Sequence, residues 1–164
     1  MTQRVALVTG AMGGLGTAIC QELAKAGHKV VASYHPQFDN KDAWLAEMAE
    51  AGFKDFVCVA GDVSSLEDCE KMVNEAEAAA GPVDILINNA GITRDKMFAK
   101  MEKDGWDAVI STNLTSLFNM TKQVSAKMAG RGWGRIVNIS SVNGVKGQAG
   151  QTNYSAAKAG VIGF

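Results

Sequence analysis

Short apolar runs rich in β-branched residues alternate along the chain with longer stretches of helical spacing. Within the runs, apolar residues follow one another almost without a break, as they do in parallel strands that helices cover on both faces. The runs predict strands at residues 4–9, 29–34, 54–60, 83–88 and 134–140.

Apolar residues at helical spacing predict helices between and after these strands. In the first helix, Leu15, Ile19, Leu23 and Ala26 form one stripe, and Gly27 supplies the turn that ends it. The other predicted helices span residues 41–51, Ser64 to about Ala80, 103–130 with a bend near Ser111 and Thr112, and the segment from Thr152 onward.

The helix over residues 64–80 has its own start and stop signals. Ser64 and Glu67 form a capping-box pattern, and Gly81-Pro82 stops the helix. Its predicted apolar face consists of Leu66, Cys69, Val73, Ala76 and Ala80.

Alternating strands and helices predict an α/β fold: a doubly wound parallel sheet of Rossmann type with three αβα layers. One domain over residues 1–164 accounts for the pattern. The strand at 134–140 is apolar on both faces and so resembles an interior strand, yet no later strand flanks it. We therefore expect a C-terminally truncated domain that lacks its last strands and substrate lid.

Composition and charge narrow the class of protein. Hydrophobic residues make up 47% and charged residues 20% of the 164 positions, near the averages for a globular domain. A formal net charge of −1 gives no basic field for nucleic acid or an anionic membrane, and no apolar run is long enough to span one. No signal peptide is recognised, so a cytoplasmic location is expected. The three cysteines lack metal-ligand spacing, and no metal site is expected.

A glycine-rich segment joins the first predicted strand to the first predicted helix. Glycines there let the chain turn tightly, and they let a pyrophosphate approach the backbone N–H groups at the positive end of the helix dipole. A glycine-rich turn alone has little specificity, but its place in a βαβ unit indicates a dinucleotide site. The predicted phosphate-binding residues are Gly10, Met12, Gly13, Gly14, Leu15 and Gly16.

The end of the second strand bears on the choice of cofactor. Enzymes that use NAD place an acidic residue there to bind the adenosine ribose, and that carboxylate repels the 2′-phosphate of NADP. Here the strand ends Ala32-Ser33-Tyr34-His35 without an acid, and His35 and Lys41 are the nearby cations. The sequence therefore favours NADPH (NADP) over NADH.

The spacing Thr9-Gly10-x-x-x-Gly14-x-Gly16 resembles the short-chain dehydrogenase/reductase family, and further motifs follow in that family's order. The resemblance covers the whole chain, and five motifs in order are highly specific. The four further motifs are Asp62-Val63 after the third strand, Asn88-Asn89-Ala90-Gly91 after the fourth, Asn113, and Ser141 thirteen positions before Tyr154-x-x-x-Lys158. By this resemblance Asp62 and Val63 contact the adenine, and Asn89, Ala90 and Gly91 line the cofactor site.

The resemblance also implies catalytic roles for four residues. Tyr154 is the expected proton donor to a ketone oxygen. A free tyrosine is a sluggish acid at neutral pH, and the charge of Lys158, one helical turn away, favours the tyrosinate. Tyr154 and Lys158 also belong to the expected cofactor-binding residues, Lys158 through the nicotinamide ribose. Ser141 contacts the substrate carbonyl, and Asn113 holds a water that links Lys158 to solvent. Ser140 is the alternative to Ser141, which the family's spacing to Tyr154 selects.

Within the family, the stretches at 106–110, 112–118 and 140–154 are similar to acetoacetyl-CoA reductases of polyhydroxyalkanoate (polyhydroxybutyrate) biosynthesis. This similarity implies hydride transfer from NADPH to the 3-keto group of an acyl-CoA substrate, giving (R)-3-hydroxybutyryl-CoA, in a homotetramer. It adds Asp95, Gln148 and Gln151 to Ser141 and Tyr154 as substrate-binding residues. For Gln148 and Gln151 plain loop polarity is the alternative, and for Asp95 a turn-stabilising role.

Two other functions are weighed against this one. A 3-oxoacyl-carrier-protein reductase of fatty-acid synthesis shares the motif at 89–95 and requires a basic patch for an acidic partner, which Arg94, Lys96, Lys100, Arg131 and Arg135 permit. A non-catalytic dinucleotide-binding protein is expected to lack Ser141, Tyr154 or Lys158, and all three are present.

Overall fold

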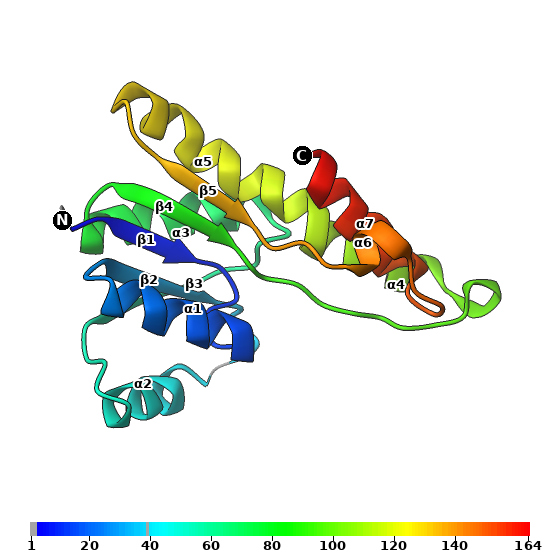
Figure 1. Cartoon of the computed structure of the whole chain (residues 1–164), viewed down its shortest axis with the longest axis horizontal. Coiled ribbons are helices and arrows are strands. Elements are labelled where there is room, and N and C mark those ends of the chain that lie inside the picture. Colours follow the sequence, from blue (N-terminus) through cyan, green and yellow to red (C-terminus); the bar gives the residue numbers. More distant parts are fainter. Residues whose placement is uncertain (1–2, 39) are drawn as a thin grey trace.

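The computed structural model of the protein describes residues 3–38 and 40–164. Its five strands form one parallel sheet in the order β3-β2-β1-β4-β5, so the direction in which successive strands are added to the sheet reverses between β1 and β4 (Figure 1). The carboxyl ends of the strands at such a reversal are the usual ligand site of doubly wound sheets. The predicted strands are confirmed as β1 (Val5–Val8), β2 (Lys29–Tyr34), β3 (Phe56–Ala60), β4 (Val83–Asn88) and β5 (Arg135–Asn138).

Helices cover both faces of the sheet, which confirms the predicted three-layer architecture (Figure 1). None of the described helices combines the length and apolarity needed to cross a membrane. The α-helices are α1 (Gly14–Lys25), α2 (Lys41–Glu50), α3 (Leu66–Ala80), α4 (Lys103–Ile110), α5 (Ser116–Gly130), α6 (Asn143–Lys146) and α7 (Thr152–Gly163). A 3-10 turn, η1 (Phe98–Lys100), precedes α4, and a π-helical segment, η2 (Ser111–Thr115), joins α4 to α5.

Strand β1 lies at the centre of the core because its side chains alternate between two clusters. Val5 and Leu7 pack with α3 and α5, whereas Ala6 and Val8 pack with α1 and α2. All four side chains are buried. This burial explains why the strands lack a polar face and why their apolar residues run without interruption.

The start of α3 lies one residue later than the capping-box pattern predicts. Ser65 is the N-cap, and its hydroxyl oxygen accepts from the Asp68 N–H at 3.2 Å. Ser64 cannot cap the helix, because its N–H and hydroxyl both donate to Asp62, at 2.8 and 2.7 Å. The predicted Ser64 cap is therefore wrong: the tight turn at Asp62 uses Ser64 first.

The predicted apolar stripe of the first helix is wrong at its ends. Leu15 is 55% exposed at the start of α1, and Ala26 lies beyond the helix as an exposed C-cap. Cys20, in the middle of α1, is fully buried. Gly27 adopts φ +83°, as predicted for the residue that ends the helix.

Two predictions about the second half of the chain are confirmed. The bend near Ser111 corresponds to η2, where the helix widens for one turn between α4 and α5. The segment from Thr152 onward is α7, which packs beside α6 and α4 at the carboxyl end of β5 (Figure 1).

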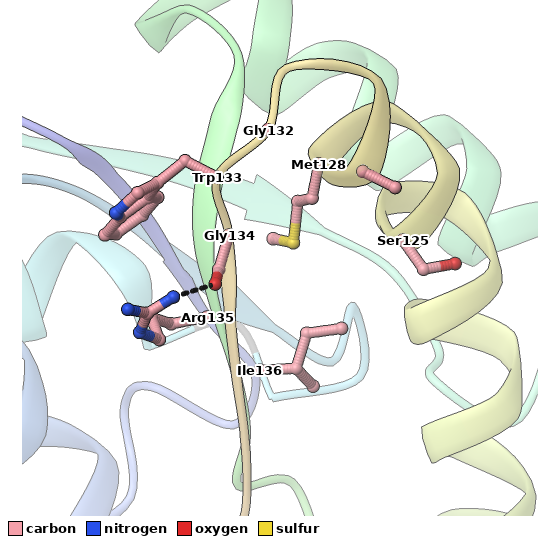
Figure 2. A pocket seen from close by; sticks show the side chains of 8 residues that line it. Ser125, Met128, Gly132, Trp133, Gly134, Arg135 and Ile136 are labelled. Atoms are coloured by element: carbon pink, nitrogen blue, oxygen red, sulfur yellow. Dashed lines mark hydrogen bonds between the residues drawn. The ribbon is translucent and has the colours of Figure 1, made fainter.

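Strand β5 pairs with β4 alone among the described residues, and its Val137 is 44% exposed. A groove of about 540 Å³ runs between this strand and the end of α5. Figure 2 shows Met128 and Ile136 facing it, with Trp133 and Arg135 on the other side of the strand. Gly134 is required here, because a Cβ at this position would lie 2.5 Å from the Cβ of Met128.

Candidate active site

A cleft of about 860 Å³ opens at the carboxyl ends of the strands and joins the glycine loop to α7. Of the predicted site residues, Lys41, Asp95, Gln148 and Gln151 are not part of its lining. The predicted residues that line it are Gly10, Met12, Gly13, Gly14, Leu15, Gly16, His35, Asp62, Val63, Asn89, Ala90, Gly91, Asn113, Ser141, Tyr154 and Lys158.

The glycine loop brings the start of α1 into this cleft. The first residues of α1 line the cleft, so the positive end of the helix faces it. Among the described residues no side chain caps this end, and no acidic residue lies in its first turn to offset the positive charge. Gly10 adopts φ +61°, which glycine tolerates best. A Cβ on Gly16 would overlap the Gly10 carbonyl oxygen and lie 2.8 Å from the Ala11 Cα. The loop is therefore compact enough for a phosphate group to reach backbone N–H groups.

Replacement of Gly16 by alanine is expected to lower the free energy of unfolding by about 3 kcal/mol, because the new methyl group meets backbone and not a mobile side chain. Gly14→Ala is the matched control in the same loop: nothing lies within 4 Å of its Cβ position, and stability is expected to stay within about 1 kcal/mol of wild type. Urea unfolding of both variants measures the difference. Equal stabilities would contradict the tight loop.

A hydrogen-bond lock joins the glycine loop to the segment after β4. The Thr9 hydroxyl oxygen accepts from the Asn89 and Ala90 N–H groups, both at 3.0 Å. The Asn89 side-chain amide donates in return to the carbonyls of Thr9, at 3.0 Å, and Gly10, at 3.1 Å. Asn89 therefore braces the floor of the cleft, and it is held by Thr9, which directly follows β1, 80 residues earlier.

His35 and Asp62 form the end of the cleft nearest β2 and β3. The His35 Nε2 lies 3.6 Å from an Asp62 carboxylate oxygen, and its Nδ1 accepts from the Gln37 N–H at 3.1 Å. Partial burial raises the pKa of Asp62, but hydrogen bonds from Ser64 and the adjacent His35 outweigh it and hold this pKa below its usual value. Asp62 is thus an ionised acceptor, and His35 is the cation-capable group beside it.

The two adjacent serines after β5 have different surroundings. The Ser140 hydroxyl donates to the Lys158 carbonyl at 2.8 Å, so its proton is committed to holding α7. The Ser141 hydroxyl oxygen accepts from the Asn143 N–H at 3.2 Å, which leaves its own proton available. This difference supports Ser141 as the serine that can donate to a ligand.

Tyr154 and Lys158 lie one turn apart on α7, at the end of the cleft opposite His35. The Lys158 Nζ is 5.6 Å from the centre of the Tyr154 ring and donates to the Ile139 carbonyl at 2.6 Å. Lys158 is only 4% exposed, and burial lowers its pKa. The fold thus holds a desolvated lysine beside a half-buried tyrosine, an arrangement typical of acid–base sites.

Asn113 is fully buried in η2, and its side chain is committed to the backbone. Its amide donates to the carbonyls of Ile92 and Val109, both at 2.9 Å, and its oxygen accepts from the Ile92 N–H at 3.2 Å. These bonds fasten the π-helical turn to the loop after β4. The predicted water at Asn113 stays a prediction.

The three predicted substrate residues outside the cleft lining belong to the loops around its entrance. Gln151 donates to the Asp95 carboxylate at 2.8 Å and accepts from the Asn143 side chain at 2.8 Å. Gln148 is exposed on the loop between α6 and α7. Their roles toward a substrate stay predictions.

Sequence reasoning missed several residues that line the cleft. Some of them lie next to predicted site residues in the sequence. Ser33 and Tyr34 directly precede His35, and Thr93 and Arg94 follow shortly after Gly91. Closeness to a recognised motif could therefore have identified these four. Phe38, on the loop after β2, carries no such signal. The full set missed is Ser33, Tyr34, Gln37, Phe38, Asn40, Gly61, Ile92, Thr93, Arg94, Thr112 and Ile139. Ser140, the alternative to Ser141 in the sequence, also lines the cleft.

Comparison with known proteins agrees with this geometry. The chain is 70% identical over 164 residues to nodulation protein G of Azospirillum brasilense and 59% identical to acetoacetyl-CoA reductase of Cupriavidus necator. It is 44% identical to 3-oxoacyl-[acyl-carrier-protein] reductase of a Synechocystis strain. In each case all of the chain matches and it spans 66% of the relative's length. The model of the short chain dehydrogenase family matches residues 4–164. The glycine loop, the Asn89 lock and the Ser141-Tyr154-Lys158 arrangement thus lie in a chain that belongs to the short-chain dehydrogenase family.

Proposed function

We propose that the protein is an NADPH-dependent oxidoreductase that reduces the 3-keto group of acetoacetyl-CoA to (R)-3-hydroxybutyryl-CoA. The observation that carries the proposal is the placement of Ser141, Tyr154 and Lys158 in the same cleft as the glycine loop. A dinucleotide bound along the cleft reaches from the positive end of α1 to this group. The stereochemistry follows the family resemblance.

The residues present fit a nicotinamide dinucleotide. Gly10 lets the loop pack closely against Ala90, Gly16 lets it pack closely on Gly10 and Ala11, and the start of α1 offers N–H groups that no side chain caps. Asp62 offers an ionised acceptor for the adenine end, and Lys158 a cation for the ribose at the other end. When bound, the nicotinamide supplies the hydride, and the protein supplies position and electrostatic field.

The chain's own residues account for the proton and the developing charge. The free proton of the Ser141 hydroxyl stabilises the ketone oxygen as negative charge grows on it. Tyr154 donates its phenolic proton to that oxygen, and the charge of Lys158 stabilises the tyrosinate that remains. Lys158 is held in place by the Ile139 carbonyl, so its position does not depend on the substrate.

Replacement of His35 by aspartate is expected to lower the preference for NADPH over NADH at least about tenfold. The variant places a second carboxylate beside Asp62, at the end of β2 where a 2′-phosphate lies in NADPH enzymes. The ratio of kcat/KM values for the two cofactors measures the effect. His35→Asn, neutral and similar in size, separates charge from shape. An unchanged ratio in His35→Asp would remove His35 from the cofactor site.

Reduction of an acyl-carrier-protein thioester is the second candidate function. The reductase from Synechocystis supports it, at 44% identity, whereas several acetoacetyl-CoA reductases stand at 51–59%. The basic residues named for an acidic partner do not form one patch. Arg131 pairs with Asp84 and donates to the Val83 carbonyl, and Arg135 stacks on Trp133, both at the amino-terminal side of β4 and β5. Arg94, which lines the cleft, remains near the entrance.

The test is oxidation of NADPH by the complete gene product with acetoacetyl-CoA and acetoacetyl-carrier protein, measured side by side. A higher kcat/KM for the CoA ester supports the proposal. A higher value for the carrier-protein ester assigns the enzyme to the second candidate and leaves the catalytic residues in place. Tight NADPH binding without turnover of either ester would favour a non-catalytic dinucleotide-binding protein.

The expected homotetramer rests on family resemblance. Phe118 on α5 and Ile162 on α7 are 51% and 57% exposed, and apolar side chains of this size are frequent at subunit contacts. Sedimentation of the complete gene product tests the tetramer, and fractionation of cells tests the expected cytoplasmic location.

A further inference from the structure

A chain of hydrogen bonds links the loop after β4 to the turn that holds Ser141. The Gln151 side-chain NH₂ donates to the Asp95 carboxylate at 2.8 Å, and the Gln151 carbonyl oxygen accepts from the Asn143 side-chain NH₂ at 2.8 Å. The Asn143 backbone N–H then donates to the Ser141 hydroxyl oxygen at 3.2 Å. The side chains of Asp95, Gln151 and Asn143 are thereby linked in series, and the backbone N–H of Asn143 connects this series to the Ser141 hydroxyl group.

The direction of each bond in this chain is determined by chemistry. An ionised Asp95 can only accept, so Gln151 must present its NH₂ to Asp95 and its oxygen to Asn143. Asn143 must then present its NH₂ to Gln151. One carboxylate therefore orients both amides, and this orientation holds the turn in which the Asn143 N–H reaches Ser141.

The position of this turn also affects α7. A Cβ on Gly144 would lie 2.6 Å from the carbonyl carbon of Lys158, so α6 packs directly on the backbone of the helix that carries Tyr154. A shift of α6 is therefore transmitted to the acid–base pair as well as to Ser141.

Other bonds keep the two loops together independently of Asn143. The Lys96 N–H donates to the Gly150 carbonyl at 2.9 Å, and the buried Asn153 side chain donates to the Arg94 carbonyl at 3.0 Å. Loss of the Asn143 amide is therefore expected to loosen one turn and not to unfold the region.

We propose that Asn143 is a positioning residue for the reduction: anchored through Gln151 to Asp95, it holds the Ser141 hydroxyl oxygen as an acceptor and aims the hydroxyl proton at the substrate carbonyl. This inference rests on the proposed function for the role of Ser141. It assigns Gln151 and Asp95 to the support of that turn, in place of direct contact with a substrate.

The test uses the fact that the direction of the hydrogen bonds between Asp95, Gln151 and Asn143 can be reversed by substitution. Asn143→Asp in the complete gene product places carboxylates at both ends of Gln151, whose oxygen must then face one of them. We expect kcat to fall about tenfold, equivalent to about 1.4 kcal/mol, with the KM for NADPH unchanged. In the double variant Asn143→Asp/Asp95→Asn, Gln151 can turn over and donate to residue 143 while it accepts from residue 95. We expect kcat to return to within about threefold of wild type.

A second readout does not depend on any substrate. Hydrogen exchange of backbone amides over residues 141–146 is expected to accelerate in Asn143→Asp and to return toward the wild-type rate in the double variant. Val145→Ala, an exposed position on the same short helix, serves as the control and is expected to match wild type in both measurements.

The outcomes separate the two proposals. Wild-type protein that reduces neither ester but shows the exchange pattern overturns the proposed function and leaves the support of the turn standing. Normal turnover in Asn143→Asp, or a double variant no better than the single one, overturns the positioning role even if the wild type is an active reductase.

Discussion

Replacement of Tyr154 by phenylalanine is expected to lower kcat/KM for ketone reduction by roughly 100- to 10,000-fold, the range that a positioned general acid contributes. The substitution removes the hydroxyl group and leaves the ring, which lies half-buried with its centre 5.6 Å from the Lys158 Nζ. Steady-state NADPH oxidation measures the loss.

Binding of the cofactor provides the control for this variant. The glycine loop and His35 line the other end of the cleft, so the dissociation constant for NADPH is expected to change by no more than about threefold. Retention of a tenth or more of the wild-type kcat/KM would exclude Tyr154 as the proton donor. A large loss of NADPH affinity would indicate a collapsed cleft and not a missing acid.

Replacement of Lys158 by methionine is expected to reduce turnover at least about 100-fold while the protein remains folded. The loss follows from removal of the positive charge that the structure places beside the Tyr154 ring. Two opposing effects keep stability near that of wild type, within about 1 kcal/mol: a desolvated ammonium is removed, and the hydrogen bond to the Ile139 carbonyl is lost.

The pH dependence of stability provides a signature of the buried lysine. Burial lowers the pKa of Lys158 from its ordinary value of 10.5, so the folded protein releases this proton at a lower pH than the unfolded chain does. Between the two pKa values the unfolded state binds more protons, and the wild type gains stability as pH rises toward 10.5. Lys158→Met is expected to lack that gain, whereas Lys122→Met, at an exposed position, retains it. Parallel curves for wild type and Lys158→Met in urea unfolding would show that the lysine is not desolvated.

Much of the candidate site was predictable because the residues proposed to bind phosphate and to act in catalysis lie in short motifs. The loop from Gly10 to Gly16, the Asn89-Ala90-Gly91 segment and the Tyr154/Lys158 pair each lie next to a predicted strand or within a predicted helix. Parallel strands bring their carboxyl ends to one edge of the sheet, so motifs that follow strands converge without further information.

The substrate end was less predictable. Asp95 and Gln151 are 56 positions apart, and their hydrogen bond depends on how two irregular loops pack. Neither periodicity nor spacing reports such a contact, and resemblance alone assigned both residues to the substrate. Asn143 was missed for the same reason, since an asparagine in a polar loop carries no pattern.

The sequence by itself determined the order of strands and helices, the burial of the sheet on both faces, and the identity of the glycine loop and the Ser141-Tyr154-Lys158 set. The elements and the glycine loop follow from local patterns, namely continuous apolar runs, helical spacing and glycine positions, which act over a few residues. The Ser141-Tyr154-Lys158 set follows from the resemblance to the family, whose spacing selects these positions. The tertiary structure decided which neighbour each polar group uses: Ser65 and not Ser64 caps α3, Ser140 is committed to Lys158, and Asn113 is bonded to Ile92. A hydroxyl or amide has several nearby partners of similar strength, and only the packed backbone selects among them.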